Sequence, residues 1–308
     1  MALSSGAPQP KRTFLVDRPP PPANRPSALD RRRLLAALAA GLTGLPGTLQ
    51  AESEAGVCSF GVFPYVPALK IGALFAPMAQ DFASVLGVGI QLRTNETFEK
   101  FRAELVAGRY DIALVHPFLY VEARREQAYV PLGRVDQELC AVIVSRRSQP
   151  VASLAELRGA RLALPPRGAG VTYLLRSAML EENLTDGVDL ELRHYQTKVS
   201  CLHAVATGEA AGCVVPSFLG AQLRAMGEMQ LVPIWQSQPI KSVVVIAHPR
   251  LPEAARTALR ARMIGWQDTE SGRSLLDRLA WPGMVAADDS EFDEVRAMSA
   301  RLSARASG

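Results

Sequence analysis

The sequence predicts an α/β protein built from two similar lobes that face each other across a cleft. From residue 57 onward, short β-rich runs alternate with helical stretches, which is the pattern of sheets covered by helices. A helix that ends in Ala/Thr-Gly just before a strand occurs twice, at residues 106–113 and 206–213. These two similar units, followed by a helical C-terminal segment that returns to the first, predict the two lobes and the cleft between them.

The composition supports a folded protein and excludes several classes of function. The chain has 308 residues, of which 48% are hydrophobic and 21% charged, enough apolar material for two medium-sized cores and too little charge for a disordered chain. The formal net charge of +4 suits an anionic ligand. Basic residues are scattered and do not alternate with aromatic ones, so we expect no nucleic-acid partner.

The first 56 residues differ from the rest and predict export. A proline-rich stretch without periodicity (residues 1–30) precedes Arg31-Arg32-Arg33, the short apolar run Leu34–Leu45, and small or polar residues up to Gly56. This order is typical of a disordered N-terminus followed by a cleaved signal peptide. The arginines resemble a twin-arginine export signal, although an ordinary secretory signal remains the alternative. We therefore expect a soluble periplasmic product, cleaved after Ala51 or Ala55.

The predicted first lobe begins directly after the signal. Its expected strands are Ser59–Phe63, Ile90–Arg93 and Asp111–Val115, and its expected helices are Ile71–Leu86, Phe98–Ala107 and a segment from Pro117 to about Gln127. Thr97 caps the second of these helices and Gly108 ends it. Together with a largely helical segment after Pro252, these elements predict a first lobe of residues 57–136 plus 250–308.

The predicted second lobe comprises residues 137–249. Its expected strands are Leu139–Ser145, Arg161–Leu164, Leu190–Tyr195, Gly212–Val215 and Lys241–Ala247, and its longer helices are Val171–Asn183 and Val199–Thr207. Ser153 and Glu156 form a capping box that opens a further short helix.

Candidate binding residues follow the carboxyl ends of these strands, where open α/β sheets bind ligands. Tyr65 follows the first strand, and the other candidates are His116, Phe118, Tyr120, Thr197, Lys198, Ser200 and Ser217. For Phe118 and Tyr120, packing in the core is an equally good interpretation.

Several segments in their order and spacing resemble one known family. These are Phe60–Pro64, Gly108–Ala113, Ser153–Gly159 after the Leu139–Ser145 strand, Ala204–Glu209 and Gly283–Phe292. They resemble phosphonate/phosphite/phosphate-type substrate-binding proteins of ABC importers. The resemblance implies a type 2 periplasmic-binding-protein fold, a small oxyanion held between the lobes, and closure that signals to a membrane permease.

The resemblance also implies where the anion binds. In relatives, a loop of hydroxyl residues at a helix N-terminus receives the oxyanion, and the matching loop here is Arg167-Gly168-Ala169-Gly170-Val171-Thr172. Thr172 is the hydroxyl that remains, while Gly168 and Gly170 allow a close approach of the backbone and Arg167 supplies charge. Where relatives tend to have a His-Asp pair, this chain has Lys198-Val199, and the lysine still favours an anion.

Four cysteines in an exported protein invite disulfide formation. The four residues are Cys58, Cys140, Cys201 and Cys213, and four cysteines can be joined in three different ways. Buried thiols that form no disulfide remain the alternative. Cys201 follows Lys198 closely, so its thiolate would suit a soft ligand such as arsenite. By analogy with sensor relatives of the family, this suggests a second function, presentation of a bound ligand to a two-component histidine kinase.

Motifs of enzymes and metal sites are missing from the sequence. It contains no G-x-S-x-G, H-E-x-x-H, C-x-x-C or P-loop pattern. We therefore expect a binding protein without catalytic activity, cofactor or metal, acting as a monomer with an ABC permease or, alternatively, a sensor kinase. A neighbouring gene for a permease or for a kinase would distinguish these functions.

Overall fold

The computed structural model of the protein describes residues 56–146, 150–219 and 231–307. The predicted signal peptide lies outside the described residues. Among the described helices, none is both long and apolar enough to cross a membrane.

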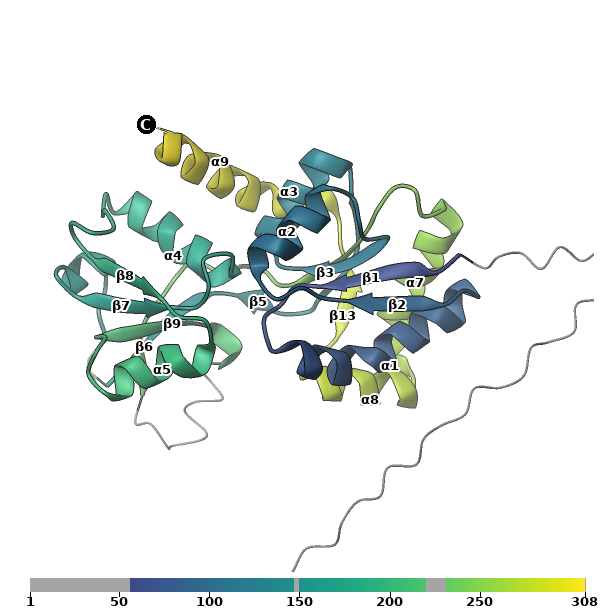
Figure 1. Ribbon diagram of the computed structural model, residues 1–308, viewed down its shortest axis with the longest axis horizontal. Helices are drawn as coiled ribbons and strands as arrows, with labels where there is room; N and C mark the ends of the chain where they lie inside the picture. Colours follow the sequence, from purple (N-terminus) through teal and green to yellow (C-terminus); the bar gives the residue numbers. More distant parts are fainter. Residues whose placement is uncertain (1–55, 147–149, 220–230, 308) are drawn as a thin grey trace, which may run out of the picture. The chain divides into compact units, whose positions relative to one another are not determined.

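A six-stranded mixed sheet forms the centre of the first lobe, with strand order β13-β4-β12-β3-β1-β2. Figure 1 labels β1, β2, β3 and β13 of this sheet. The pairs β1–β2 and β1–β3 are parallel, and the pairs that involve β12 or β13 are antiparallel. The strands are β1 (Cys58–Val62), β2 (Ile90–Arg93), β3 (Ile112–Val115), β4 (Val130–Val135), β12 (Val244–Ala247) and β13 (Met284–Ala286).

Helices pack against this sheet through a core rich in aromatic side chains. The helices are α1 (Ala68–Leu86), α2 (Phe98–Val106), α3 (Pro117–Gln127), α7 (Glu253–Ile264) and α8 (Glu270–Leu279). Phe60 of β1 packs against Phe82 of α1, whose ring in turn stacks on Trp266. Local signals set the helix ends: the Thr97 hydroxyl accepts a hydrogen bond from the Lys100 amide, and Gly87 ends α1 with a φ of +67°.

Asp111 ties three segments of this lobe together. Its carboxylate accepts hydrogen bonds of 2.7 Å from both the amide and the hydroxyl of Ser59, and one of 2.5 Å from Nε of Arg250. Burial alone would raise the pKa of Asp111, but the hydrogen bonds from Ser59 and the Arg250 guanidinium outweigh it and hold that pKa below its usual value. The Gly108–Ala113 motif therefore contributes a structural anchor of the sheet.

A five-stranded mixed sheet forms the second lobe, with strand order β10-β6-β9-β7-β8. The strands are β6 (Ala141–Ser145), β7 (Arg161–Leu164), β8 (Glu191–His194), β9 (Gly212–Pro216) and β10 (Val232–Gln236), and the helical elements are η1 (Leu154–Leu157), α4 (Gly170–Glu181) and α5 (Lys198–Ala206). β7 pairs in parallel with β8 and β9, and β6 is antiparallel to β9 and β10. The fold predicted from the sequence, two α/β lobes, is confirmed.

A disulfide joins Cys201 of α5 to Cys213 of β9, with 5.9 Å between their Cα atoms. Of the pairings that the sequence left open, the structure shows this one, while Cys58 and Cys140 are buried free thiols. Because the Cys201 sulfur is bonded to Cys213, the predicted thiolate ligand at this position is a misassignment.

The boundaries between the lobes differ from the predicted ones. The predicted single strand 241–247 is two strands: β11 (Ile240–Lys241) pairs with β5 (Glu138–Leu139), and β12 enters the first-lobe sheet. Residues 244–247 therefore pair outside the predicted second lobe of 137–249. The C-terminal helix α9 (Asp293–Ser307) contacts both α3 and α4 (Figure 1), and its Val295 and Met298 join the second-lobe core, although the sequence assigned 250–308 to the first lobe.

Strands β4, β10 and β13 were not predicted from the sequence. In β4, Pro131 pairs with β12 at an irregularity of the register, and in β10, Pro233 lies next to a similar one. A proline cannot donate a hydrogen bond within a sheet, and irregularities of this kind accommodate it. The prolines therefore concealed β4 and β10, which long-range pairing stabilises.

Candidate functional site

A cavity of about 770 Å³ lies where the two lobes meet, at the carboxyl ends of several strands. Both lobes line it. The lining residues are Phe63–Ala68, Lys70, Asn95, Glu96, Phe98, His116, Leu139, Pro165, Pro166, Ala169–Val171, Gln196–Val199, Val214, Pro216, Phe218 and Val243. A concave site of this size, with few polar groups, has the dimensions of a ligand pocket.

Helices α1 to α5 all begin at or next to the wall of this cavity. The lining includes Ala68 and Phe98, the first residues of α1 and α2, and the His116 N-cap of α3. In the second lobe it includes Gly170 and Lys198, the first residues of α4 and α5. In α3 the first residue, Pro117, has no amide hydrogen and His116 accepts from the Leu119 amide, so this terminus offers the least to a ligand. In the other four helices, first-turn amides lack partners within the helix and the helix dipole is positive, so these termini favour an anion.

Two lysines from opposite lobes supply the positive side chains of the cavity. Lys70 comes from α1 and Lys198 from α5. Nζ of Lys198 lies 5.8 Å from the centroid of the Tyr65 ring, within the range of a cation–π contact. Burial, followed by the nearby charge of Lys70, lowers the pKa of Lys198. The attraction of a bound anion would offset both effects.

The negative charge at the cavity is largely compensated. Among the lining residues, Glu96 is the acidic one, and its Oε2 accepts a hydrogen bond of 2.6 Å from Nζ of Lys100. Asn95 accepts a hydrogen bond of 2.6 Å from the hydroxyl of Tyr110, which orients its amide. The electrostatics of the cavity are therefore positive.

His116, a predicted site residue, lines the cavity as a neutral side chain that connects the lobes. Nε2 lies 2.9 Å from the carbonyl of Gly168, so it donates, and Nδ1 accepts from the amide of Leu119 at 3.4 Å. Complete burial lowers the pKa of His116 to about 4. With both nitrogens engaged and no charge at neutral pH, His116 organises the cleft and offers no hydrogen bond to a ligand.

The two glycines of the predicted anion loop bring the lobes together. A Cβ on Gly168 would lie 2.4 Å from the Cβ of Phe98, and one on Gly170 would lie 3.2 Å from the His116 ring. Phe98 and His116 belong to the first lobe, so the glycines allow close approach to that lobe. Ala169 and Gly170 line the cavity, whereas Gly168 and the exposed Arg167 do not.

The predicted hydroxyl ligands serve the local backbone. The Thr197 hydroxyl caps α5 by accepting from the amide of Ser200, whose own hydroxyl lies 2.8 Å from it. Thr172 is buried and directs its hydroxyl toward the carbonyl of Pro166 at 3.5 Å. The Ser217 hydroxyl accepts from the amide of Cys140. Of these four, Thr197 alone lines the cavity.

Phe118 and Tyr120 are packing residues. Phe118 stacks on Tyr173 of α4 with ring centroids 4.9 Å apart, which adds a second contact between the lobes. Tyr120 is buried and its hydroxyl donates to the carboxylate of Asp289. Neither residue lines the cavity, so the core interpretation applies.

Six of the predicted site residues line the cavity, namely Tyr65, His116, Ala169, Gly170, Thr197 and Lys198, and other lining residues were not predicted. Asn95 and Gln196 each follow the carboxyl end of a strand, so the rule that selected the other candidates should have included them. Lys70 lies in the first turn of a helix after such a strand. Phe98 and Phe218 gave no signal that distinguished them from core residues.

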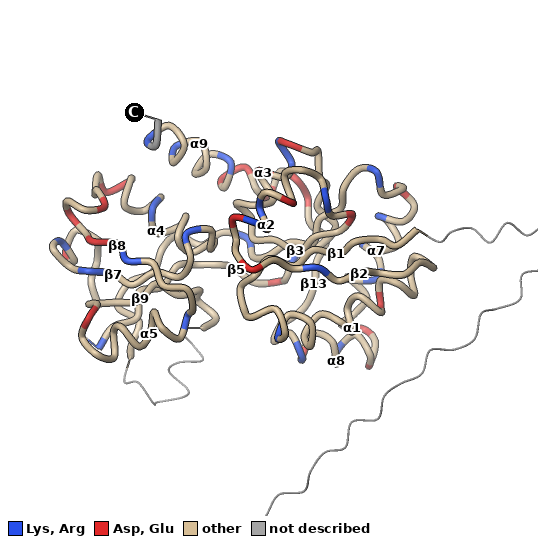
Figure 2. The backbone as a smooth tube through the Cα atoms, viewed as in Figure 1, with Lys and Arg blue, Asp and Glu red and all other residues tan. Residues whose placement is uncertain are grey.

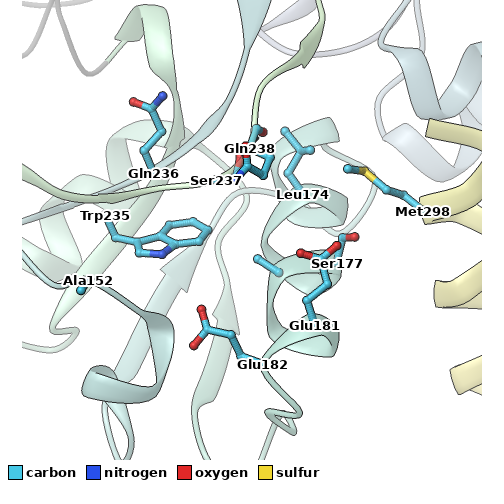
Figure 3. A pocket seen from close by; sticks show the side chains of 11 residues that line it. Ala152, Leu174, Ser177, Glu181, Glu182, Trp235, Gln236, Ser237, Gln238 and Met298 are labelled. Carbon is cyan, nitrogen blue, oxygen red and sulfur yellow. Dashed lines mark hydrogen bonds between the residues drawn. The ribbon is translucent and has the colours of Figure 1, made fainter. Parts of the chain in front are cut away.

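A second, smaller pocket of about 190 Å³ lies in the second lobe beside α9 (Figure 3). Trp235, Glu181, Glu182 and Met298 contribute to it. Glu182 accepts hydrogen bonds from the amides of Leu154 and Ala155, which begin η1. Two carboxylates and no lysine or arginine among its lining residues make this pocket unsuited to an anion. The described residues also include no cluster of side chains able to hold a metal ion.

Charge elsewhere on the protein is mixed. Lysine and arginine are interspersed with aspartate and glutamate in both lobes (Figure 2). Many of the described arginines pair with acidic neighbours, as Arg93 does with Glu104 and Arg262 with Asp81. The positive groups of the cleft are therefore a local feature.

Two α/β lobes around a ligand-sized cavity at the carboxyl ends of their strands define a type 2 periplasmic-binding-protein fold. The sequence profile described as "ABC transporter, phosphonate, periplasmic substrate-binding protein" matches residues 60–292. The chain belongs to this family. Members of the family are transport proteins that bind a small ligand and work with a membrane permease.

Solved structures show the same fold at low sequence identity. A binding-protein component of an ABC phosphonate transporter from Pseudomonas aeruginosa is 13% identical with a TM-score of 0.68, covering 80% of this chain and 86% of that one. PhnD1 from Prochlorococcus marinus, solved with methylphosphonate, is 11% identical with a TM-score of 0.71, covering 80% and 98%. A Xanthomonas citri protein solved with ATP is 15% identical with a TM-score of 0.66, covering 80% and 97%. A search of curated protein sequences finds no match.

Proposed function

We propose that the chain is exported to the periplasm, captures an anionic phosphonate-type solute in the cavity between its lobes, and delivers it to the permease of an ABC importer. The observation that carries this proposal is the meeting of Lys70, Lys198 and the first turns of α1, α2, α4 and α5 at one cavity. Positive charge and the amides of helix N-termini are two features that anion sites in proteins share.

The positions of the lysines suggest how binding couples to closure. Lys70 and Lys198 belong to different lobes and repel each other, as the lowered pKa of Lys198 reflects after the effect of burial. An anion between them replaces this repulsion with two attractions and draws the lobes together. We place the hinge at β5 and β11, because the chain passes between the lobes at these paired strands.

Backbone amides take the role that the family resemblance gave to hydroxyls. The loop before α4 carries Thr172 as its hydroxyl, and that hydroxyl faces the carbonyl of Pro166. In this proposal the donors to the anion are the amides of Gly170 and Val171 in α4, those of Lys198 and Val199 in α5, and the two lysine ammonium groups. This arrangement supports a doubly charged, three-oxygen head group such as a phosphonate.

A thermal-shift and calorimetric screen of the purified chain tests this function. We expect methylphosphonate to raise the melting temperature and to bind with one-to-one stoichiometry, with phosphite, phosphate and sulfate as the competing anions. Binding of none of these anions would overturn the proposal, and binding of phosphate or phosphite alone would change the solute class. Size-exclusion chromatography would test the expectation that the chain is a monomer.

The sensor alternative has lost the residue that suggested it, because Cys201 is in a disulfide. The presence of a kinase gene instead of permease genes next to the coding sequence would revive it.

A further inference from the structure

Resting on the proposed function, we infer that the solute is an organophosphonate with a bulky alkyl or aryl group, larger and more apolar than methylphosphonate, phosphite or phosphate. Three features of the cavity carry this inference: its volume, the chemistry of its wall, and the apolar side chains exposed at its edge.

The cavity is much larger than a small oxyanion requires. At the roughly 30 Å³ that a water molecule occupies in the liquid, the non-hydrogen atoms of phosphate would need about 150 Å³. The cavity offers about 770 Å³ while the lobes already touch through Phe98 and Gly168 and through Phe118 and Tyr173. The remaining space matches a ligand body of many more atoms.

Apolar side chains and prolines form most of the wall. Each lobe contributes: Phe63, Val66 and Phe98 come from the first, and Val171, Val199, Val214 and Phe218 from the second. The Thr197 hydroxyl caps α5 and Glu96 pairs with Lys100, which leaves few lining polar groups besides Tyr65, Asn95 and Gln196. A sugar or an amino group in this space would lose its hydration for few new partners, whereas an alkyl or aryl group gains from burial.

Apolar side chains that water would otherwise contact gather beside the cavity. The large hydrophobic residues that stand out as exposed in the described chain are Val57, Leu69, Val188, Val199 and Phe218. Val199 is 70% exposed and Phe218 41%, yet both line the cavity, and Leu69 lies between the lining residues Ala68 and Lys70. Exposed apolar surface concentrated at a pocket indicates an apolar ligand.

Calorimetry with a homologous series provides the test. Methyl-, propyl- and hexylphosphonate share one head group, so differences in their affinity report on binding of the alkyl chain alone. Each buried methylene should tighten binding about fourfold, and hexylphosphonate should therefore bind at least about a hundredfold more tightly than methylphosphonate. Equal or falling affinity along the series would overturn this inference while leaving the proposed function intact. A chain that binds no phosphonate of any length would overturn both.

Variants at the cavity edge locate the effect. Val199→Ser and Phe218→Ser should each weaken hexylphosphonate binding by about threefold or more, and by a larger factor than they weaken methylphosphonate binding. Val188→Ser is the matched control, because Val188 is 80% exposed and does not line the cavity. If Val188→Ser weakens hexylphosphonate binding as much as Val199→Ser does, the apolar body binds elsewhere and the inference fails.

Discussion

Replacing Lys198 with methionine should have opposite effects on ligand binding and on the stability of the ligand-free protein. The side chain lines the cavity, lies over Tyr65 and has a pKa lowered first by burial and then by Lys70. A charge held in this way is costly without a ligand and favourable with one. Methionine keeps the apolar stem and removes the charge.

The loss in binding follows from the type of contact removed. A hydrogen bond to a charged group contributes about 1.5–3 kcal/mol, so Lys198→Met should weaken methylphosphonate binding by roughly 10- to 150-fold. The wild-type affinity should also fall as the pH rises through the lowered pKa of Lys198, because the neutral amine no longer attracts the anion. This pH dependence should be smaller in the variant.

The effect on stability has the other sign. Between the lowered pKa of Lys198 and its ordinary value of 10.5, the unfolded chain binds more protons than the folded one. The contribution of this group to stability therefore rises with pH through that window, and its full penalty is present below it. Lys198→Met removes the penalty, so the ligand-free variant should be at least as stable as the wild type at neutral pH.

Isothermal titration with methylphosphonate and urea denaturation without ligand measure the two effects separately. Arg278→Met is the control for loss of one positive charge, since Arg278 is exposed in the last turn of α8 and does not line the cavity. An unchanged dissociation constant in Lys198→Met would refute the reasoning, and so would a joint loss of binding and stability.

Other predictions concern the disulfide, the contact between lobes and acid stability. The double variant Cys201→Ala/Cys213→Ala opens a loop with a sequence separation of 12 and should lower the free energy of unfolding in urea by about 3 kcal/mol; an unchanged midpoint would contradict this. Gly168→Ala places a Cβ 2.4 Å from that of Phe98, so it should cost about 1–3 kcal/mol and weaken methylphosphonate binding, and a variant with wild-type affinity would show that this contact does not matter. Because the pKa of Asp111 is held below 3.8, its contribution is present above that pH and lost as the pH falls through the lowered value. Asp111→Asn should therefore flatten the acid limb of the stability curve, and an unaltered limb would argue against this anchor.

Local signals were sufficient to predict much of the fold. Thr97 and Gly108 predicted where α2 begins and ends, and the capping box at Ser153 predicted η1. Pairing between distant strands was not accessible in this way. Ile240–Lys241 and Val244–Ala247 are adjacent in sequence yet pair in different sheets, so the predicted lobe boundary separated β12 from its partners.

In the candidate site too, local sequence rules predicted some features, whereas contacts formed in the folded chain could not be predicted. The rule that ligands bind at the carboxyl ends of strands brought Tyr65 and Lys198 to the cavity. It could not show that His116 uses both ring nitrogens within the protein or that the Thr197 hydroxyl caps α5, because these partners depend on local geometry. Cysteine pairing likewise required the separation between α5 and β9 in the folded chain.

Titration of the purified chain with methylphosphonate, for the wild type and for the double variant Lys70→Gln/Lys198→Gln, tests capture of a phosphonate-type anion in the cleft most directly. Our account predicts saturable one-to-one binding by the wild type and no measurable binding by a double variant that remains folded. Equal binding by the two proteins, or no phosphonate binding by the wild type, would contradict it.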